Sequence, residues 1–302
     1  MDLGKKLESR GQYAKAADEY GTALRGVDGL PTDGRAFLSR IALGSVAAAS
    51  GRYTDAEQWD NDAVRQGMEI YGNDAPELAV PFGNLAALYR DQGNYVRAEE
   101  LSRRAVRLMS DQQPEVPAKR AELLGTLGGI LSARGKFEEA ESALRQSIDI
   151  AKTIPAPSEI LAADWSNLAG VYARTGRLTQ ALALYREAYA LENQLDGNNP
   201  NLFFILAGTA SVEGALGNYA AAVSSIQSAI QRAEAGGPED TLQIRDALLA
   251  EAAWLHKLKR ERDAKRIRAK AQRVAETVSR NSYSRYTVDA RQLEKTIVGP
   301  PK

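Results

Sequence analysis

Apolar residues recur along this chain at the spacing of amphipathic helices, and their pattern is interrupted at regular intervals. Between residues 163 and 192, for example, apolar residues stand mostly three or four positions apart on either side of Gly176: Trp165, Leu168, Ala169, Tyr172, Ala181, Tyr185 and Ala188. This spacing places them on one face of a helix. The segment is therefore predicted to form two helices that are separated by a turn at Gly176.

A short phrase marks this turn and recurs along the chain. It consists of Gly, an aromatic residue or Leu two positions later, and Ala three positions after that: Gly11/Tyr13/Ala16, Gly51/Tyr53/Ala56, Gly93/Tyr95/Ala98, Gly135/Phe137/Ala140, Gly176/Leu178/Ala181 and Gly217/Tyr219/Ala222. A degenerate copy is Lys259/Glu261/Ala264, and successive copies are 40 to 42 residues apart. Glycine ends helices because it readily adopts positive φ. The period is typical of helical solenoids.

The eleven prolines fall between these phrases or in the C-terminal tail. Proline disrupts helix interiors, so it marks the other connections independently of the glycines. Pro81 is expected either in the first turn of a helix or at a kink. Aromatic residues of the phrase are expected to fill the hairpin turn as core residues: Tyr53, Tyr95, Phe137 and Tyr219.

Together the signals predict an all-α solenoid of about seven helical hairpins. The predicted units are residues 1–29, 34–72, 76–111, 116–154, 158–195, 200–236 and 240–276, followed by a C-terminal cap or tail at 277–302.

The large and small positions of residues 163–192 resemble the signature of the tetratricopeptide repeat (TPR). The segment Tyr71-Gly-Asn-Asp-Ala-Pro-Glu-Leu-Ala79 resembles the linker of the kinesin light chain type of this repeat, with Ala75 where that type usually has His. The resemblance covers nearly all of residues 1–276. It implies a right-handed α-α superhelix whose first helices line a concave groove, and it implies protein recognition as the usual role of the family.

The resemblance also indicates which residues point into the groove. Most are small and are expected to leave room for a ligand: Ser45, Gly83, Ala87, Gly125, Gly129, Gly170, Ala207, Ser211 and Gly214. The chaperone-binding members of the family hold a terminal carboxylate with a Lys at one groove position. The corresponding residues here include no Lys, so no carboxylate clamp is expected: Ile41, Gly83, Gly125, Ser166, Ala207 and Leu249.

Five polar residues are candidates for partner binding. Asn84, Thr126 and Asn167 stand at one equivalent position, and Arg90 and Arg174 lie nearer the far ends of their helices. The family uses Asn at this position to hold the backbone of an extended peptide, because an amide can both donate and accept hydrogen bonds. The alternative is that these amides satisfy contacts between helices.

Catalysis is not expected. The chain has one histidine, His256, and no cysteine, so it offers no Ser/His/Asp set, no thiolate nucleophile and no histidine cluster for a metal. Neighbouring acids such as Glu99 and Glu100 are interpreted as solvated residues at a helix N-terminus, where carboxylates are favourable. No cofactor is predicted.

Charge narrows the possible partners. Lys plus Arg equals Asp plus Glu at 39 each, so the whole chain has no general attraction for nucleic acid or anionic membrane. Residues 257–273 hold nine basic and two acidic side chains. This basic end is interpreted as the polar face of a terminal cap, with a patch for an acidic or nucleic-acid partner as the alternative. Neutralising Lys265, Arg266 and Arg268 would separate the two.

Residues 1–10 are charged, and no apolar stretch approaches the ~20 residues of a membrane span. A cytoplasmic location is therefore expected, or a periplasmic one if an N-terminal signal has been removed.

The sequence thus predicts a non-enzymatic adaptor or scaffold that binds a peptide segment or protein surface in its groove. The alternatives are a regulatory module of a larger enzyme or signalling protein and a scaffold that acts through its basic end. The sequence specifies neither the partner nor the oligomeric state.

Overall fold

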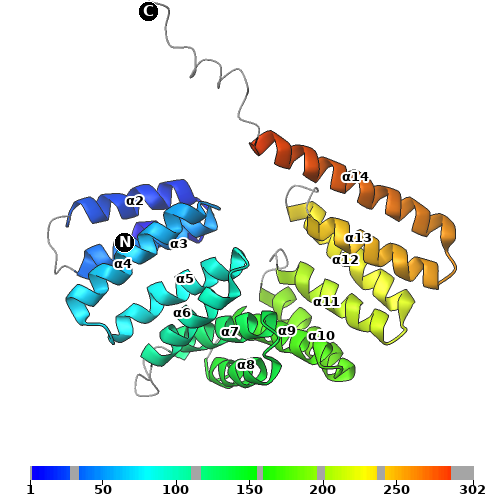
Figure 1. The fold of residues 1–302 in the computed structure, drawn as a ribbon, viewed down its shortest axis with the longest axis horizontal. Helices are drawn as coiled ribbons and strands as arrows, with labels where there is room; N and C mark the ends of the chain where they lie inside the picture. The colour runs from blue at the N-terminus through cyan, green and yellow to red at the C-terminus, as the bar shows by residue number, and fades with distance from the viewer. Residues whose placement is uncertain are drawn as a thin grey trace, which may run out of the picture. The chain divides into compact units, whose positions relative to one another are not determined.

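The computed structural model describes residues 2–27, 34–109, 117–154, 159–195, 201–236 and 242–286, and these residues form α-helices, one short 3-10 helix and no strand (Figure 1). The helices are α1 (Asp2–Glu8), α2 (Tyr13–Arg25), α3 (Gly34–Ala49), α4 (Tyr53–Tyr71), η1 (Pro76–Leu78), α5 (Ala79–Asp91), α6 (Tyr95–Leu108), α7 (Pro117–Ala133), α8 (Phe137–Ala151), α9 (Glu159–Arg174), α10 (Leu178–Leu195), α11 (Asn201–Ala215), α12 (Tyr219–Gly236), α13 (Leu242–Lys257) and α14 (Glu261–Tyr286). The predicted all-α class is confirmed.

The chain divides into two compact units, Met1–Val171 and Tyr172–Lys302, and the boundary falls inside α9. In the first unit, α1 packs on α2, α3 on α4, α5 on α6 and α7 on α8. In the second, α11 packs on α12 and α13 on α14. Each unit is therefore built from consecutive helical hairpins. The exact bounds of the seven predicted repeats stay a prediction.

The repeated glycines lie in the turns and adopt the backbone conformation that the sequence predicts. The six glycines of the phrase all have positive φ, between 67° and 81°: Gly11, Gly51, Gly93, Gly135, Gly176 and Gly217. Lys259, in the degenerate copy, also has positive φ at 58°. A left-handed residue stops one helix and lets the next begin within two residues. The phrase therefore sets the hairpin turns.

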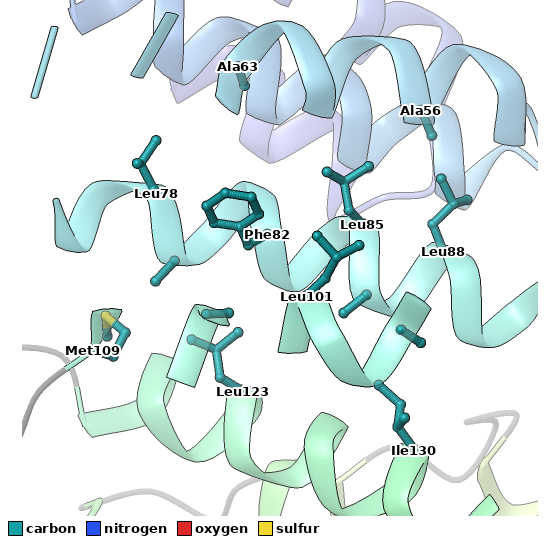
Figure 2. Close-up of a cluster of buried hydrophobic side chains, with 14 of the residues drawn as sticks. Ala56, Ala63, Leu78, Phe82, Leu85, Leu88, Leu101, Met109, Leu123 and Ile130 are labelled. Carbon is teal, nitrogen blue, oxygen red and sulfur yellow. The ribbon is translucent and has the colours of Figure 1, made fainter. Parts of the chain in front are cut away.

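Small residues allow the paired helices to approach closely. The alanines of the phrase are fully buried: Ala16, Ala56, Ala98, Ala140, Ala181, Ala222 and Ala264. Larger side chains fill the space between hairpins. Figure 2 shows such a cluster, in which Phe82 and Leu85 of α5 lie near Leu101 of α6 and Leu123 of α7. Burial of this surface is the main force that holds neighbouring hairpins together.

Three local features decide or correct expectations from the sequence. Pro81 lies in the first turn of α5, where a missing N–H has little effect.

Tyr53 and Tyr95 are 46% and 38% exposed, so the expectation that they are core residues is wrong. They are the first residues of α4 and α6, where the preceding turn leaves the ring at the surface. The last helix, α14, continues ten residues beyond the predicted unit end at 276, to Tyr286.

Candidate functional site

Asn84 lies in α5 and faces the hairpin that precedes it. Its Nδ2 donates to Asp60 Oδ1 of α4 at 3.1 Å and lies 3.5 Å from Ser45 Oγ of α3. The side chain is half-buried, and its Oδ1 accepts no hydrogen bond within the described part of the chain. One half of the amide therefore serves a contact between helices, and the carbonyl half is available to another molecule.

Asn167 of α9 occupies a matching place farther along the chain. A Cβ added to Gly129 of α7 would lie 3.9 Å from Asn167 Nδ2, and Gly129 is equivalent to Ser45 in the repeat. Both amides thus point at the same position of the preceding first helix. Asn167 is exposed, and Thr126, at the same position of α7, is half-buried.

The two candidate arginines are held differently. Arg90 Nε donates to Asp91 Oδ1 at 2.9 Å, and both side chains are largely solvated, so this pair adds little stability. Arg174 is exposed at the end of α9 and belongs to the second compact unit, whereas the other four candidates belong to the first. The structure brings Asn84 together with Ser45 and Asp60. It does not place Arg174 relative to them.

A cavity of about 280 Å³ opens beside Asn84. Its walls come from α3, α4 and α5, and the residues that line it are Gly44, Ser45, Ala48, Ala49, Tyr53, Ala56, Asp60, Asn84, Ala87, Leu88 and Asp91. The small residues make the space, as the groove prediction proposed for Ser45 and Ala87. Two carboxyl groups and no cationic side chain line this cavity.

Asp60 is the lining residue that the sequence analysis missed. It is 2% exposed and stands nine residues after its turn glycine, Gly51. The equivalent residues of five other hairpins are Tyr20, Ser102, Leu144, Tyr185 and Ile226, most of which are large. A carboxylate in a position that is usually filled by a large apolar residue was the signal. Comparison of the repeats position by position would have found it.

Burial changes the acidity of Asp60. Desolvation raises the pKa of its carboxyl from 3.8 to about 7, and the hydrogen bond from Asn84 partly opposes this effect. Asp164 of α9 behaves similarly, because burial raises its pKa to about 7 against a hydrogen bond with Ser147. Ser147 Oγ lies 2.6 Å from the Ala121 carbonyl and 2.5 Å from Asp164 Oδ2. One hydroxyl proton cannot serve both acceptors, so a protonated Asp164 fits this contact.

Several small residues assigned to the groove instead face side chains of a neighbouring helix. A Cβ on Gly83 would lie 2.4 Å from Leu123, one on Gly125 2.3 Å from Asp164, and one on Gly214 2.4 Å from Trp254. These glycines permit helices to approach each other. The expectation that they leave room for a ligand is wrong, because side chains of the neighbouring hairpin occupy that space.

Glu99 also departs from its expected role. It is buried in α6, and its carboxylate contacts Arg103, Arg134 and Lys136. Hydrogen bonds from these three cations outweigh desolvation and lower its pKa to about 2. Glu99 therefore joins α6 to the turn between α7 and α8 and is not a solvated residue. Glu100 remains exposed and pairs with Arg97.

The basic end lies largely in α14. Arg260 and Arg266 pair with Asp263, and Lys270 pairs with Glu234 of α12 at 2.6 Å. Lys265 and Arg268 are exposed. Part of the positive charge is thus neutralised within the second unit.

Two absences concern the described residues. They contain no group of three or more His, Cys, Asp or Glu side chains that could hold a metal ion. None of their helices is long and apolar enough to cross a membrane.

Comparison with solved structures finds several proteins that have the same fold. One is a chain from Podosopora anserina described as a kinesin light chain with nearly identical TPR-like repeats, with 18% identity, 68% of this chain and 98% of that chain covered, and a TM-score of 0.56. BtubC (BKLC) from P. vanneervenii has 21% identity, 75% and 91% coverage, and a TM-score of 0.59. The APC/C hetero-tetramer Cut9-Hcn1 has 16% identity, 81% and 41% coverage, and a TM-score of 0.63. At these identities the likeness concerns the fold, and it confirms the predicted kinesin light chain-like architecture.

Comparison with curated proteins gives no match. Comparison with models of protein families identifies the repeat. Models described as tetratricopeptide repeat match residues 36–111 and 159–235, residues 1–69, and residues 120–154. Because one of them covers about half of the chain, and all of them agree with the turns and hairpins described above, this chain belongs to the tetratricopeptide repeat family.

Proposed function

We propose that this chain is a non-catalytic interaction scaffold that holds an extended peptide segment of a partner protein along the first helices of its hairpins. Membership of the tetratricopeptide repeat family supports the general role of an interaction scaffold, because TPR proteins bind protein partners. One of the similar structures, Cut9-Hcn1, is itself an assembly of proteins.

The repeated amide is the observation that carries the proposal. Asn84 and Asn167 stand at one repeat position, on α5 and α9, and each faces the first helix before it. Neither amide oxygen accepts a hydrogen bond within the described residues, and Asn167 is exposed. An amide oxygen that has no donor in that part of the chain can accept a hydrogen bond from a peptide N–H without regard to the side chains of the peptide. Two such groups would hold an extended segment in register.

A substitution at Asn167 tests this proposal with the least structural disturbance. A random peptide library is selected against the immobilised chain, and the enriched peptides are synthesised for titration. Asn167→Ala is expected to weaken their binding by about 0.5–1.5 kcal/mol, the usual net value of one hydrogen bond. Asn84→Ala is less clean, because Asn84 also supports Asp60.

Asn61→Ala is the matched control. Asn61 is an exposed Asn of α4, a second helix, so its loss is expected to leave affinity unchanged. Circular dichroism of all variants checks that the helices are retained. Equal binding by the wild-type chain and the Asn167→Ala variant would contradict the proposed binding face. The same conclusion follows if the library yields no enriched peptide at all.

A further inference from the structure

The cavity beside Asn84 has a chemical character that the proposed function does not explain. The buried carboxyl group of Asp60 forms part of the cavity wall. Oδ1 of this group accepts a hydrogen bond from Asn84, whereas Oδ2 has no hydrogen-bond partner within the described residues. Asp91, which pairs with Arg90, adds a second carboxyl group to the lining. A buried acceptor that faces an open space without a donor points to a donor supplied by another molecule.

The cavity lies where the repeat carries Asp in place of a larger residue. In the first hairpin Tyr20 lies against Gly4, and in the α7/α8 hairpin Leu144 lies against Gly128; a Cβ on these glycines would come within 2.4 Å and 2.5 Å of the larger side chain. Asp60 stands at the same position and faces Gly44, where the corresponding distance to Oδ1 is 2.8 Å. The smaller aspartate leaves space that Tyr or Leu fills elsewhere, and it gives that space a polar end.

We propose that this cavity binds the side chain of a Lys or Arg residue of the partner peptide, with the cationic group at Asp60 and the aliphatic stem against Ala48, Ala87 and Leu88. The inference rests on the proposed function, because it assigns one side-chain pocket on the face that is proposed to hold the peptide. Long basic side chains combine an apolar stem with a charged end, which matches these walls.

A cationic ligand fits because the largest unfavourable contribution is already present in the free chain. Asp60 is desolvated before any ligand binds, so above about pH 7, where its carboxyl group is ionised, a cation gains the interaction without a further penalty for burying the acid. The other titratable groups that line the cavity are Tyr53 of α4 and Asp91 of α5, while α3 lines it with none. Two carboxyl groups supply fewer ligands than the six to eight oxygens that Ca²⁺ takes, so an organic cation is the better match.

The first experiment uses the same random peptide library on two chains in parallel, wild type and Asp60→Asn. Asn removes the charge and retains an oxygen for Asn84, so this variant is expected to fold. We expect peptides enriched on the wild-type chain to share a Lys or Arg at one fixed position, and we expect the variant to lose this preference. Enriched peptides that depend on Asn167 but share no basic residue would overturn the inference and leave the proposed function standing. A library without enriched peptides overturns both.

The second experiment measures the charge interaction directly. A selected peptide is compared with a version that carries citrulline in place of Arg, or norleucine in place of Lys. The neutral peptide is expected to bind the wild-type chain about tenfold more weakly, and the Asp60→Asn variant within about twofold of its charged parent. The Arg and Lys versions of one peptide show which cation is preferred.

Two further variants separate this pocket from general effects. Asp164→Asn neutralises another buried aspartate, which does not line the cavity, and is expected to keep the tenfold preference. Ala87→Leu narrows the cavity without a change of charge and is expected to reduce that preference. A tenfold preference that persists in Asp60→Asn would overturn the assignment, as would its loss in Asp164→Asn.

Discussion

Two hairpins of the first compact unit share one backbone frame and differ in what fills it. In each, a glycine of the first helix faces a residue sixteen positions later in the second: Gly44 faces Asp60, and Gly128 faces Leu144. Leu144 is fully buried against Gly128, whereas Asp60 borders a cavity of about 280 Å³. The repeat frame therefore tolerates either filling. In these two hairpins, the residue at this one position is apolar in one case and lines a pocket in the other.

The comparison predicts the largest effect when the polar residue is moved to the α7/α8 hairpin. Leu144→Asp should lower the free energy of unfolding by about 4–5 kcal/mol, because it removes buried apolar contacts and leaves a carboxyl group without a donor. Urea unfolding followed by circular dichroism measures this change. A loss below about 1 kcal/mol would mean that the two hairpins are equally permissive, which contradicts the comparison.

A pH series gives the next largest effect. Because the pKa values of Asp60 and Asp164 are raised to about 7, the folded chain keeps protons that the unfolded chain has lost above about pH 4. The free energy of unfolding should therefore fall between pH 5 and 7.5, by about 2–3 kcal/mol for each aspartate, and level off above that. Glu99, whose pKa is lowered, acts in the opposite sense at lower pH, where stability is lost as the pH falls from 4.5 through about 2.

Asp60→Asn and Asp164→Asn should each remove about half of this fall in stability, and the double variant should show almost none between pH 5 and 7.5. Urea unfolding at pH 5, 6, 7 and 8 measures the slope. A wild-type chain with constant stability over this range would contradict the burial of both carboxyl groups.

Most of the fold could be predicted from the chain because its signals are local. The glycine residue type alone predicts the turns at Gly51, Gly93 and Gly135, and all three have positive φ. The site was harder to predict. Asn84 was found because the family resemblance points to it, but its contact with Asp60 depends on how two hairpins pack. Periodicity assigns Asp60 to the buried stripe of α4 without showing that a cavity accompanies it.

The reverse exchange should stabilise the chain. Asp60→Leu fills the cavity with the residue type that packs against Gly128 in the α7/α8 hairpin, and it removes a buried ionisable group. Replacing such groups with apolar ones is often favourable, and a gain of about 1–3 kcal/mol is expected at pH 7.5. Thermal unfolding at that pH measures it, with Leu144→Ile as the control for a change of shape in an apolar site. A loss of stability would mean that Asp60 supports its hairpin, contrary to the comparison.

The smallest effect concerns the two glycines. Gly128→Ala should cost about 1–2 kcal/mol, because the new methyl group would meet Leu144 at 2.5 Å in a packed core. Gly44→Ala should cost less than about 1 kcal/mol, because Asp60 can move toward the cavity. Equal losses in urea unfolding would show that the space beside Asp60 does not relieve the contact.

The pocket at Asp60 is tested most directly by the pKa of its carboxyl group, which ¹³C NMR measures in the presence and absence of a selected basic peptide. Asp60→Asn identifies the resonance. In the free chain we expect a pKa of about 7. Binding of the basic peptide should lower it, because a nearby cation favours the ionised carboxylate, and the citrulline or norleucine version should not. A pKa that is unchanged by the bound basic peptide would contradict the binding of a cationic group at Asp60.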